Sequence, residues 1–295
     1  MGKRQGIVQR LGCFRSWRII AALGAHLALA ASPAAAAGQP KRVVSLDLCT
    51  DQLLLELAPR ERIAAVTHLA GDAAVSAIPD KARGIPITHG AAEDVLAYDP
   101  DLILAGPFGV STTIDLLRRL QRNVVVVPLA QDLDGVRKAV AIVAAALGEE
   151  ARGAARLAEF ERRLAGLGAA AGAKTPSALV YQVGGIVSAP GSLADAVLAA
   201  AGFRNKAKDY PLSRNGQVPL ELLLASPPDV LVLSSRGDQY RTAVADNLRH
   251  PALTDLRRTH ASLELPWQLW LCGTPHVAEA IERLAAARDR LRARP

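Results

Sequence analysis

The amino-acid sequence predicts an α/β protein with two lobes, each built on a parallel sheet, and a helical segment between them. Three observations support this fold class. Short apolar runs alternate with segments of helical periodicity, as expected for parallel strands that are covered on both faces. Between residues 132 and 172 two helical patterns follow each other directly, and then the alternation resumes. One helix–turn–strand pattern also occurs twice, once in each half of the chain.

Length and composition narrow the class of protein. The chain has 295 residues, of which 50% are hydrophobic and 21% are charged. This is enough chain for one large domain or two ordinary ones, with a core that needs no disulfide framework. Beyond the N-terminal region no stretch approaches the roughly 20 uninterrupted apolar residues of a membrane-spanning helix. A polytopic membrane protein is therefore excluded.

Residues 1–37 are predicted to be a signal peptide that is cleaved near Ala37. A basic region without acids precedes an apolar core at residues 19–31, and four alanines then supply a cleavage site. A membrane anchor is the alternative, but the apolar core is short for a span. Because this segment holds no adjacent arginine pair, export through the general secretion pathway is expected. The basic residues are Lys3, Arg4, Arg10, Arg15 and Arg18.

Removal of this segment lowers the formal net charge from +7 to +2, because it takes away five basic residues and no acid. Such a small charge does not indicate a nucleic-acid partner. Two cysteines remain, Cys49 and Cys272. In an oxidising compartment they can pair, and otherwise they are free thiols or small buried hydrophobes. The sequence alone cannot place their Cα atoms within bonding range.

Residues 42–131 are predicted to form an N-terminal α/β lobe. The first helix of this lobe is expected to begin with Thr50 as its N-cap, because a threonine there precedes an apolar helical pattern. An Asp-Pro pair leads into the third strand. Strands are expected at residues 42–47, 63–67, 101–105 and 124–128, and helices at residues 49–57 and 111–120.

Residues 132–172 are predicted to be a helical segment and residues 177–290 a C-terminal α/β lobe. Gly148 separates a helix at 133–147 from a long helix at 149–167, which carries one apolar stripe. Gly202 is expected to cap a helix in the second lobe. In that lobe, strands are expected at residues 178–183 and 230–233, and helices at residues 192–201, 220–225 and 274–287.

The repeated pattern places a glutamate in the first turn of a short helix in each lobe. Glu93 precedes a Pro-Asp pair and an apolar strand, and Glu221 does so at the same spacing. Acids favour the first turns of helices, so each glutamate alone has a helix-dipole explanation. Matching positions in two lobes favour a shared role in recognition instead.

With these features the chain resembles the periplasmic substrate-binding proteins of ABC importers for iron complexes and cobalamin. The resemblance covers about residues 42–290. It is carried by the opening Arg-Val-Val-Ser-Leu strand, the two Glu-x6-Pro-Asp units, the Leu-Gly break before the long helix, the Ala-Gly-Phe-Arg-Asn segment at 201–205, and Leu-Pro-Trp at 265–267.

The resemblance implies two Rossmann-like lobes bridged by a single long α-helix, with the ligand in the cleft between them and small lobe motion. It also implies a monomer in the periplasm that docks Glu93 and Glu221 onto arginines of a membrane permease dimer. The expected ligand is a ferric siderophore or cobalamin, with haem as the alternative. The chain would hold no cofactor of its own and would not be an enzyme.

Ligand contacts are expected where strands of an open α/β sheet end, because ligands bind outside the carboxyl ends of such strands. Two tryptophans in a proline-bounded loop add an aromatic surface for a macrocycle or catecholate, although either could instead fill the core. The candidate contacts are Asp47, Cys49, Thr50, His68, Phe108, Tyr181, Gln182, Arg236, Trp267 and Trp270.

Other classes receive less support. The histidines are scattered along the chain, so no site for a bare metal ion is expected. The chain has no G-x-S-x-G, G-x-G-x-x-G or P-loop motif that would favour an enzyme. An α/β enzyme or a ligand sensor without a transport role remains the rival interpretation.

Overall fold

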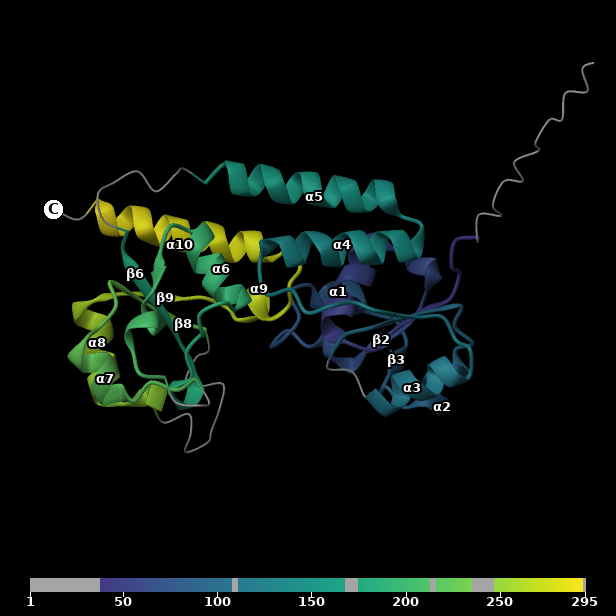
Figure 1. Ribbon diagram of the computed structural model, residues 1–295, viewed down its shortest axis with the longest axis horizontal. Coiled ribbons are helices and arrows are strands. Elements are labelled where there is room, and N and C mark those ends of the chain that lie inside the picture. The colour runs from purple at the N-terminus through teal and green to yellow at the C-terminus, as the bar shows by residue number, and fades with distance from the viewer. Residues whose placement is uncertain (1–37, 108–110, 168–174, 213–215, 235–246, 294–295) are drawn as a thin grey trace, which may run out of the picture. The chain divides into compact units, whose positions relative to one another are not determined.

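The architecture follows from a computed structural model, which describes residues 38–107, 111–167, 175–212, 216–234 and 247–293 (Figure 1). It contains two parallel sheets with helices packed against them. The predicted fold class is therefore confirmed. The predicted signal peptide lies outside the described residues.

The first sheet has five parallel strands in the order β3-β2-β1-β4-β5. This order is that of a doubly wound, Rossmann-like sheet. Its strands are β1 (Val43–Ser45), β2 (Ile63–Thr67), β3 (Ile87–Thr88), β4 (Leu102–Ala105) and β5 (Val124–Val126). The helices of this lobe are α1 (Leu48–Leu57), α2 (Ala92–Ala97) and α3 (Ser111–Arg119), with 3-10 turns η1 (Arg60–Arg62), η2 (His68–Gly71) and η3 (Pro79–Ala82).

The first sheet is buried on both faces. Val43 belongs to the core between the sheet and helices α1 and α4, and its neighbour Val44 belongs to a separate core on the other face. Both side chains are completely buried. Since neighbouring residues of a strand point to opposite faces, continuous apolar strands are what this sandwich of helices requires.

The second sheet has four parallel strands in the order β7-β6-β8-β9. Its strands are β6 (Ser177–Tyr181), β7 (Arg204–Asn205), β8 (Val230–Leu233) and β9 (Ala261–Glu264). The helices are α6 (Leu193–Ala200), α7 (Leu220–Ala225), α8 (Pro251–Thr259), α9 (Gln268–Leu271) and α10 (Val277–Arg292), with 3-10 turns η4 (Val183–Gly185) and η5 (Lys206–Asp209).

A helical segment lies between the two lobes, and its second helix bridges them. Helix α4 (Leu133–Leu147) ends at Gly148, whose φ of 68° lies in the left-handed region that favours glycine, and α5 (Glu150–Ala165) follows. Figure 1 shows α5 lying across both α4 and α10. Leu157 packs against the core of the first lobe, and Phe160 is buried in the core of the second.

Two ion pairs fix α5 near these side chains, one next to Leu157 and one about a turn after Phe160. Arg156 contacts the carboxylate of Glu56 on α1 through two nitrogens, at 2.8 and 3.1 Å. Arg163 contacts Glu282 on α10 through two bonds of 2.7 Å. Paired contacts of this kind between a guanidinium and a carboxylate give a defined orientation. The predicted single bridging helix is therefore present as α5.

The N-cap prediction for the first helix is wrong. Helix α1 begins at Leu48, and the cap is Asp47, whose carboxylate accepts hydrogen bonds from the backbone N–H groups of Cys49 and Thr50. The hydroxyl of Thr50 is buried and bonds to Ser45 instead, at 2.8 Å. An aspartate one residue before the helix outcompetes a threonine inside it, because only the residue before the helix can reach both free N–H groups.

Two other differences lie near the C-terminus. The closing helix α10 begins at Val277 and continues to Arg292, later at both ends than predicted. The tryptophan segment, expected to be a loop, contains the short helix α9, which carries Trp270.

Candidate functional site

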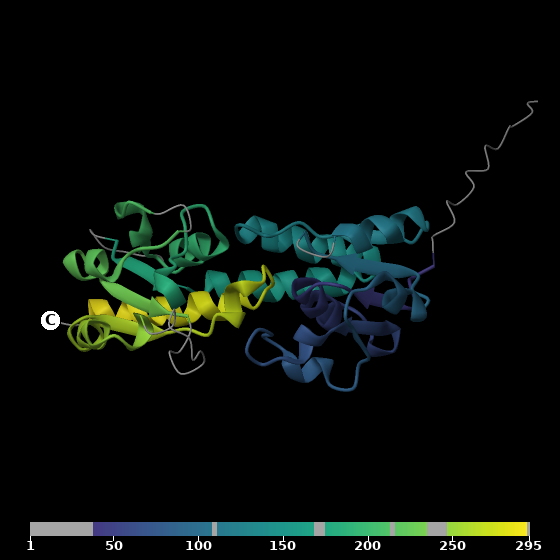
Figure 2. The same cartoon turned by 90° about the horizontal axis from the view of Figure 1, so that it is seen from below.

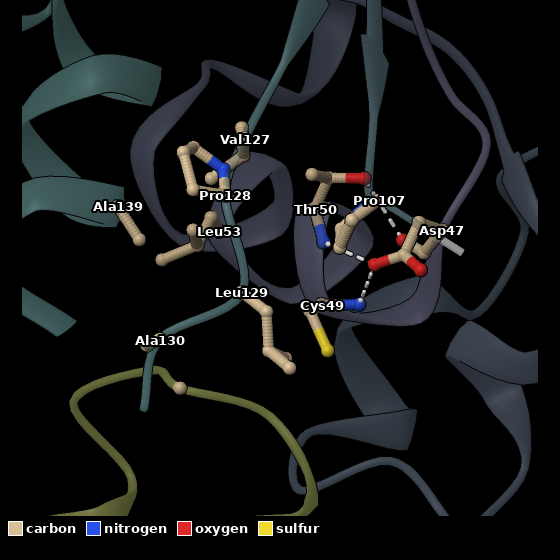
Figure 3. Close-up of a pocket in the computed structure, with 11 residues that line it drawn as sticks. Asp47, Cys49, Thr50, Leu53, Pro107, Val127, Pro128, Leu129, Ala130 and Ala139 are labelled. Carbon is tan, nitrogen blue, oxygen red and sulfur yellow. Dashed lines mark hydrogen bonds between the residues drawn. The ribbon is translucent and has the colours of Figure 1, made fainter. Parts of the chain in front are cut away.

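Three cavities surround the connection between β5 and α4, at residues 127–131. The first, of about 460 Å³, has walls from this connection and from the second lobe. The second, of about 30 Å³, lies against α1 and is shown in Figure 3. The third, of about 550 Å³, lies between the connection and α4. Leu129 lines all three cavities and leaves 42% of its surface exposed.

The cavity of about 460 Å³ brings together three of the predicted contact residues, Gln182, Trp267 and Trp270. Gln182 directly follows β6, where the strand order of the second sheet reverses, the usual ligand-binding position in such sheets. Trp270 is only 6% exposed and also belongs to the core of the second lobe. Trp267 is half-buried and packs against the same core.

The predicted contacts Asp47, Cys49 and Thr50 line the cavity of about 30 Å³ (Figure 3). This space accommodates about one water molecule and no larger ligand. Figure 3 shows the hydrogen bonds that the carboxylate of Asp47 accepts as the cap of α1, and Leu129 beside Cys49 on the same cavity. These side chains therefore stabilise the start of α1 next to the candidate site.

Cys49 and Cys272 form a disulfide with their Cα atoms 5.1 Å apart. Cys49 lies in the first turn of α1, and Cys272 caps α9 in the second lobe. In Figure 2 the yellow stretch ahead of α10 approaches the purple helix α1. The sequence left open whether the two cysteines are paired or free, and the structure pairs them in a bond that joins the two lobes.

His68 begins η2, directly after β2, and is exposed. Its ring stacks on that of His89, which follows β3, with the ring centroids 5.8 Å apart. His68 does not line any of the three cavities. It therefore stands at the carboxyl edge of the first sheet without sharing a cavity with the tryptophans.

Tyr181 was predicted to contact the ligand, which requires an accessible side chain, but it lies in the core. It is 1% exposed and packs in the core of the second lobe, and burial raises the pKa of its hydroxyl. We therefore leave it out of the proposed ligand contacts. Two further predicted contacts, Phe108 and Arg236, lie outside the described residues.

The predicted docking residues Glu93 and Glu221 are both exposed. Each lies in the first turn of a short helix, α2 in the first lobe and α7 in the second. Leu222 and Leu224 beside Glu221 are partly exposed as well.

Several cavity residues were not predicted. Leu129, Ala130 and Gln131 follow β5, and the rule that identified Asp47 after β1 also applies to this strand. The residues at 188–194 are harder to find, because they follow a 3-10 turn and an irregular stretch instead of a strand. No sequence signal distinguishes them from an ordinary surface loop.

Across the described ranges no group of three or more His, Cys, Asp or Glu side chains is arranged to hold a metal ion. Nor does that part of the chain contain a helix that is long and apolar enough to span a membrane.

Comparison with known proteins identifies related chains. A family model described as periplasmic binding protein matches residues 43–258. A cobalamin-binding protein from two strains of Halobacterium salinarum is 30% identical over 206 residues, which is 68% of this chain and 56% of that protein. The chain thus spans about half the length of these curated relatives.

Two solved structures are similar to this chain in fold. The periplasmic heme-binding protein RhuT from Roseiflexus sp. RS-1, in its apo form, has a TM-score of 0.68 at 23% identity, covering 84% of this chain and 98% of that one. The ABC-type Fe3+-hydroxamate transport system protein from Saccharomonospora viridis DSM 43017 has a TM-score of 0.63 at 25% identity, covering 85% of this chain and 94% of that one.

Proposed function

We propose that this chain, which belongs to the periplasmic binding protein family, is the solute-binding component of an ABC importer and carries a metal complex. The observation that supports this most strongly is the cavity of about 460 Å³ with Leu129 and Gln131 on one side and Gln182, Trp267 and Trp270 on the other. A ligand held there would touch the connection that leaves the first lobe and the aromatic residues of the second.

The chemistry of this cavity suits a large organic complex. Ligand sites of this size are mostly apolar, with a few polar groups that fix orientation. Here two indole rings supply flat apolar surface, and two glutamine amides supply donors and acceptors. The relatives are named for cobalamin, heme and Fe3+-hydroxamate, which are all metals enclosed by organic ligands. A ferric siderophore or cobalamin is the proposed cargo.

A chelated metal fits this chain better than a bare ion. An enclosed metal brings its own coordination shell, so the protein needs surface and hydrogen bonds instead of a cluster of ligating side chains. The described residues offer such surface, and no cluster of three metal-ligating side chains.

Haem is the second candidate ligand, and the exposed imidazole of His68 favours it. Imidazole is a common axial ligand of haem iron. If haem is the cargo and extends from the cavity at Trp267 to His68 at the carboxyl edge of the first sheet, a His68→Ala variant will shift the main absorption band of the bound haemin, whereas a Trp267→Phe variant will weaken binding without that shift.

Delivery requires export and a membrane partner. Residues 1–37 would direct the chain to the periplasm, and residues 42–131 and 177–290 would form the two lobes, joined by residues 132–172. Glu93 and Glu221 would dock onto basic residues of a permease dimer, one from each lobe. Two separated surface charges contribute orientation and association rate more than raw affinity. The carrier itself is proposed to act as a monomer.

Tryptophan fluorescence tests the proposal. The purified protein would be titrated with cyanocobalamin, haemin and ferrioxamine B, with metal-free desferrioxamine B as the control. We expect saturable quenching by one metal complex, beyond its optical absorption, and a smaller response in a Trp267→Phe variant. Calorimetric titrations in which none of the metal complexes binds would contradict the proposal for these ligand classes.

A further inference from the structure

Helix α1 contacts the second lobe near both of its ends. In its first turn Cys49 is bonded to Cys272. In its last turn the Oε1 atom of Glu56 lies 3.2 Å from the Nε2 atom of His276, an ion pair when the imidazole is protonated. Cys49 and Glu56 are seven residues apart, which is two helical turns and about 10 Å along α1 in total, so both lie on the same side of the helix. Their partners stand only four residues apart, in the connection between α9 and α10.

Basic side chains from three parts of the fold contact the carboxylate of Glu56. Its side chain is only 5% exposed, and its oxygens contact Arg156 of α5 at 2.8 Å, Lys81 of η3 at 3.6 Å and His276 at 3.2 Å. Burial alone would raise the pKa of Glu56, but the contacts with these groups outweigh burial and lower it. The first lobe, the bridging helix and the second lobe therefore share one ionised carboxylate.

Between the two contacts the backbone packs tightly. Cys272 and Thr274 are each 1% exposed. A Cβ atom added to Gly273 would lie 2.1 Å from the Cβ of Ala130, far inside van der Waals contact. Ala130 belongs to the connection between β5 and α4 that lines the ligand cavity. The segment at 272–276 is thus tightly packed between the two lobes and has no space to shift.

We propose that Cys49, Cys272, Glu56 and His276 form a two-point clamp that sets the distance between the two walls of the ligand cavity. These four are positioning residues, because Cys272 and His276 fix the segment next to Trp267 and Trp270, while Cys49 and Glu56 fix α1 beneath Leu129. A site held at its bound spacing avoids part of the ordering cost of binding. The effect on ligand affinity rests on the proposed function, whereas the clamp itself does not.

The clamp is tested first without any ligand. Dithiothreitol supplies two electrons and two protons, which convert the disulfide into two thiols while the reagent becomes a cyclic disulfide. Hydrogen exchange would be measured on oxidised protein, reduced protein and a Cys49→Ser/Cys272→Ser variant. We expect about tenfold faster exchange at residues 266–276 when the bond is absent, with β6 and β8 unchanged. The same increase is expected at residues 72–78, because the carbonyls of Ala73 and Ala74 accept hydrogen bonds from Gln268 and Trp267. Equal exchange rates in the oxidised and reduced protein would overturn the proposal.

The ionic point of the clamp has a matched control. Glu56→Gln removes the charge that faces His276, and Glu264→Gln removes the charge of a pair that Arg257 and Glu264 form at 2.8 Å within the second lobe. We expect faster exchange at residues 266–276 in the first variant only. His276→Gln, which keeps a donor of similar reach, should restore slow exchange relative to His276→Ala. Identical exchange in Glu56→Gln and Glu264→Gln would remove Glu56 from the clamp.

Affinity is measured second, with whichever of cyanocobalamin, haemin and ferrioxamine B binds the oxidised protein. We expect reduction to weaken binding about tenfold in the wild-type protein and not at all in the double serine variant. An unchanged dissociation constant on reduction would show that the clamp does not position the cavity. If none of the three complexes binds, the proposed function fails for these classes, while the exchange experiment still decides the clamp.

Discussion

The indole nitrogen of Trp267 donates a hydrogen bond to the carbonyl oxygen of Ala74, with 3.2 Å between the two atoms. Trp267 belongs to the second lobe, and Ala74 lies 193 residues earlier, in the loop after η2 of the first lobe. The neighbouring Gln268 makes a similar bond to the carbonyl oxygen of Ala73, at 3.4 Å. The aromatic side of the cavity is therefore tied to the first lobe by hydrogen bonds as well as by the disulfide.

Phenylalanine substitutions should separate the roles of the two tryptophans. Trp267→Phe keeps an aromatic ring but loses the bond to Ala74, so we expect a cost of about 1 kcal/mol in the free energy of unfolding. Trp270 is almost completely buried, and Trp270→Phe leaves space in the core, at a cost of about 2 kcal/mol. Urea unfolding of both variants measures this. A larger loss for Trp267→Phe than for Trp270→Phe would contradict the assignment.

A buried carboxyl group should make stability depend on pH near neutrality. Asp51 is completely buried on α1, and Thr67 donates to its carboxylate from its backbone N–H at 3.2 Å and from its hydroxyl at 2.5 Å. Burial outweighs these bonds and raises the pKa of Asp51 from its ordinary 3.8 to about 7. The folded protein thus keeps a proton between about pH 4 and pH 7 that the unfolded chain releases.

Because the folded protein binds this extra proton, the free energy of unfolding falls as the pH rises. The stabilising effect of the raised pKa is complete below pH 3.8 and is lost as the pH rises through about 7. About three pKa units correspond to about 4 kcal/mol across the whole window. Asp51→Asn removes the titrating group, so its free energy of unfolding should fall less than that of the wild type between pH 5 and pH 8. Parallel pH curves for the two proteins would contradict this prediction.

Gly273 should not tolerate a side chain unless Ala130 is shortened. Gly273→Ala places a methyl group against the Cβ of Ala130, and overpacking of this kind costs about 1–3 kcal/mol. Adding Ala130→Gly frees the space and should recover most of the lost stability. Gly71→Ala is the control, since a Cβ there meets no atom within 4 Å. Thermal unfolding measures all three variants, and the absence of recovery in the double variant would show that the clash lies elsewhere.

Charge reversal at the two exposed glutamates should separate docking from binding. Glu93→Lys and Glu221→Lys together should lower uptake in cells at least about tenfold, because both charges would then repel a basic permease surface. The dissociation constant of the ligand should stay within about twofold, since both residues lie outside the cavities. Glu61→Lys, an exposed acid on η1, is the control. Loss of ligand binding in the double variant would refute the docking role.

Elements set by local patterns could be predicted from the sequence. The strand at Ile63–Thr67 and the helix at Leu220–Ala225 have the predicted bounds, because a short apolar run and a first-turn acid after proline are local signals. Short edge strands escaped prediction. The two residues of β7, Arg204 and Asn205, are polar, and β9 is only partly buried, so neither carries the continuous apolar pattern of a central strand.

The candidate site was less predictable, because it depends on contacts between distant segments. Cys49 and Cys272 are 223 residues apart, and only the packing of α1 against the α9–α10 connection brings them together. The rule of carboxyl strand ends pointed to Gln182, which lines the cavity. It could not show that Tyr181, one residue earlier, points into the core, because a shift of one residue reverses the face of a strand.

The metal complex is proposed to bind between the two lobes, and calorimetric titration of two variants checks this position. Leu129→Ala trims the wall that follows the first lobe, and Trp267→Phe trims the wall of the second. With the metal complex that binds the wild type, we predict about a tenfold loss of affinity in each variant. Unchanged affinity in either variant would place the ligand on one lobe only and would contradict the claim.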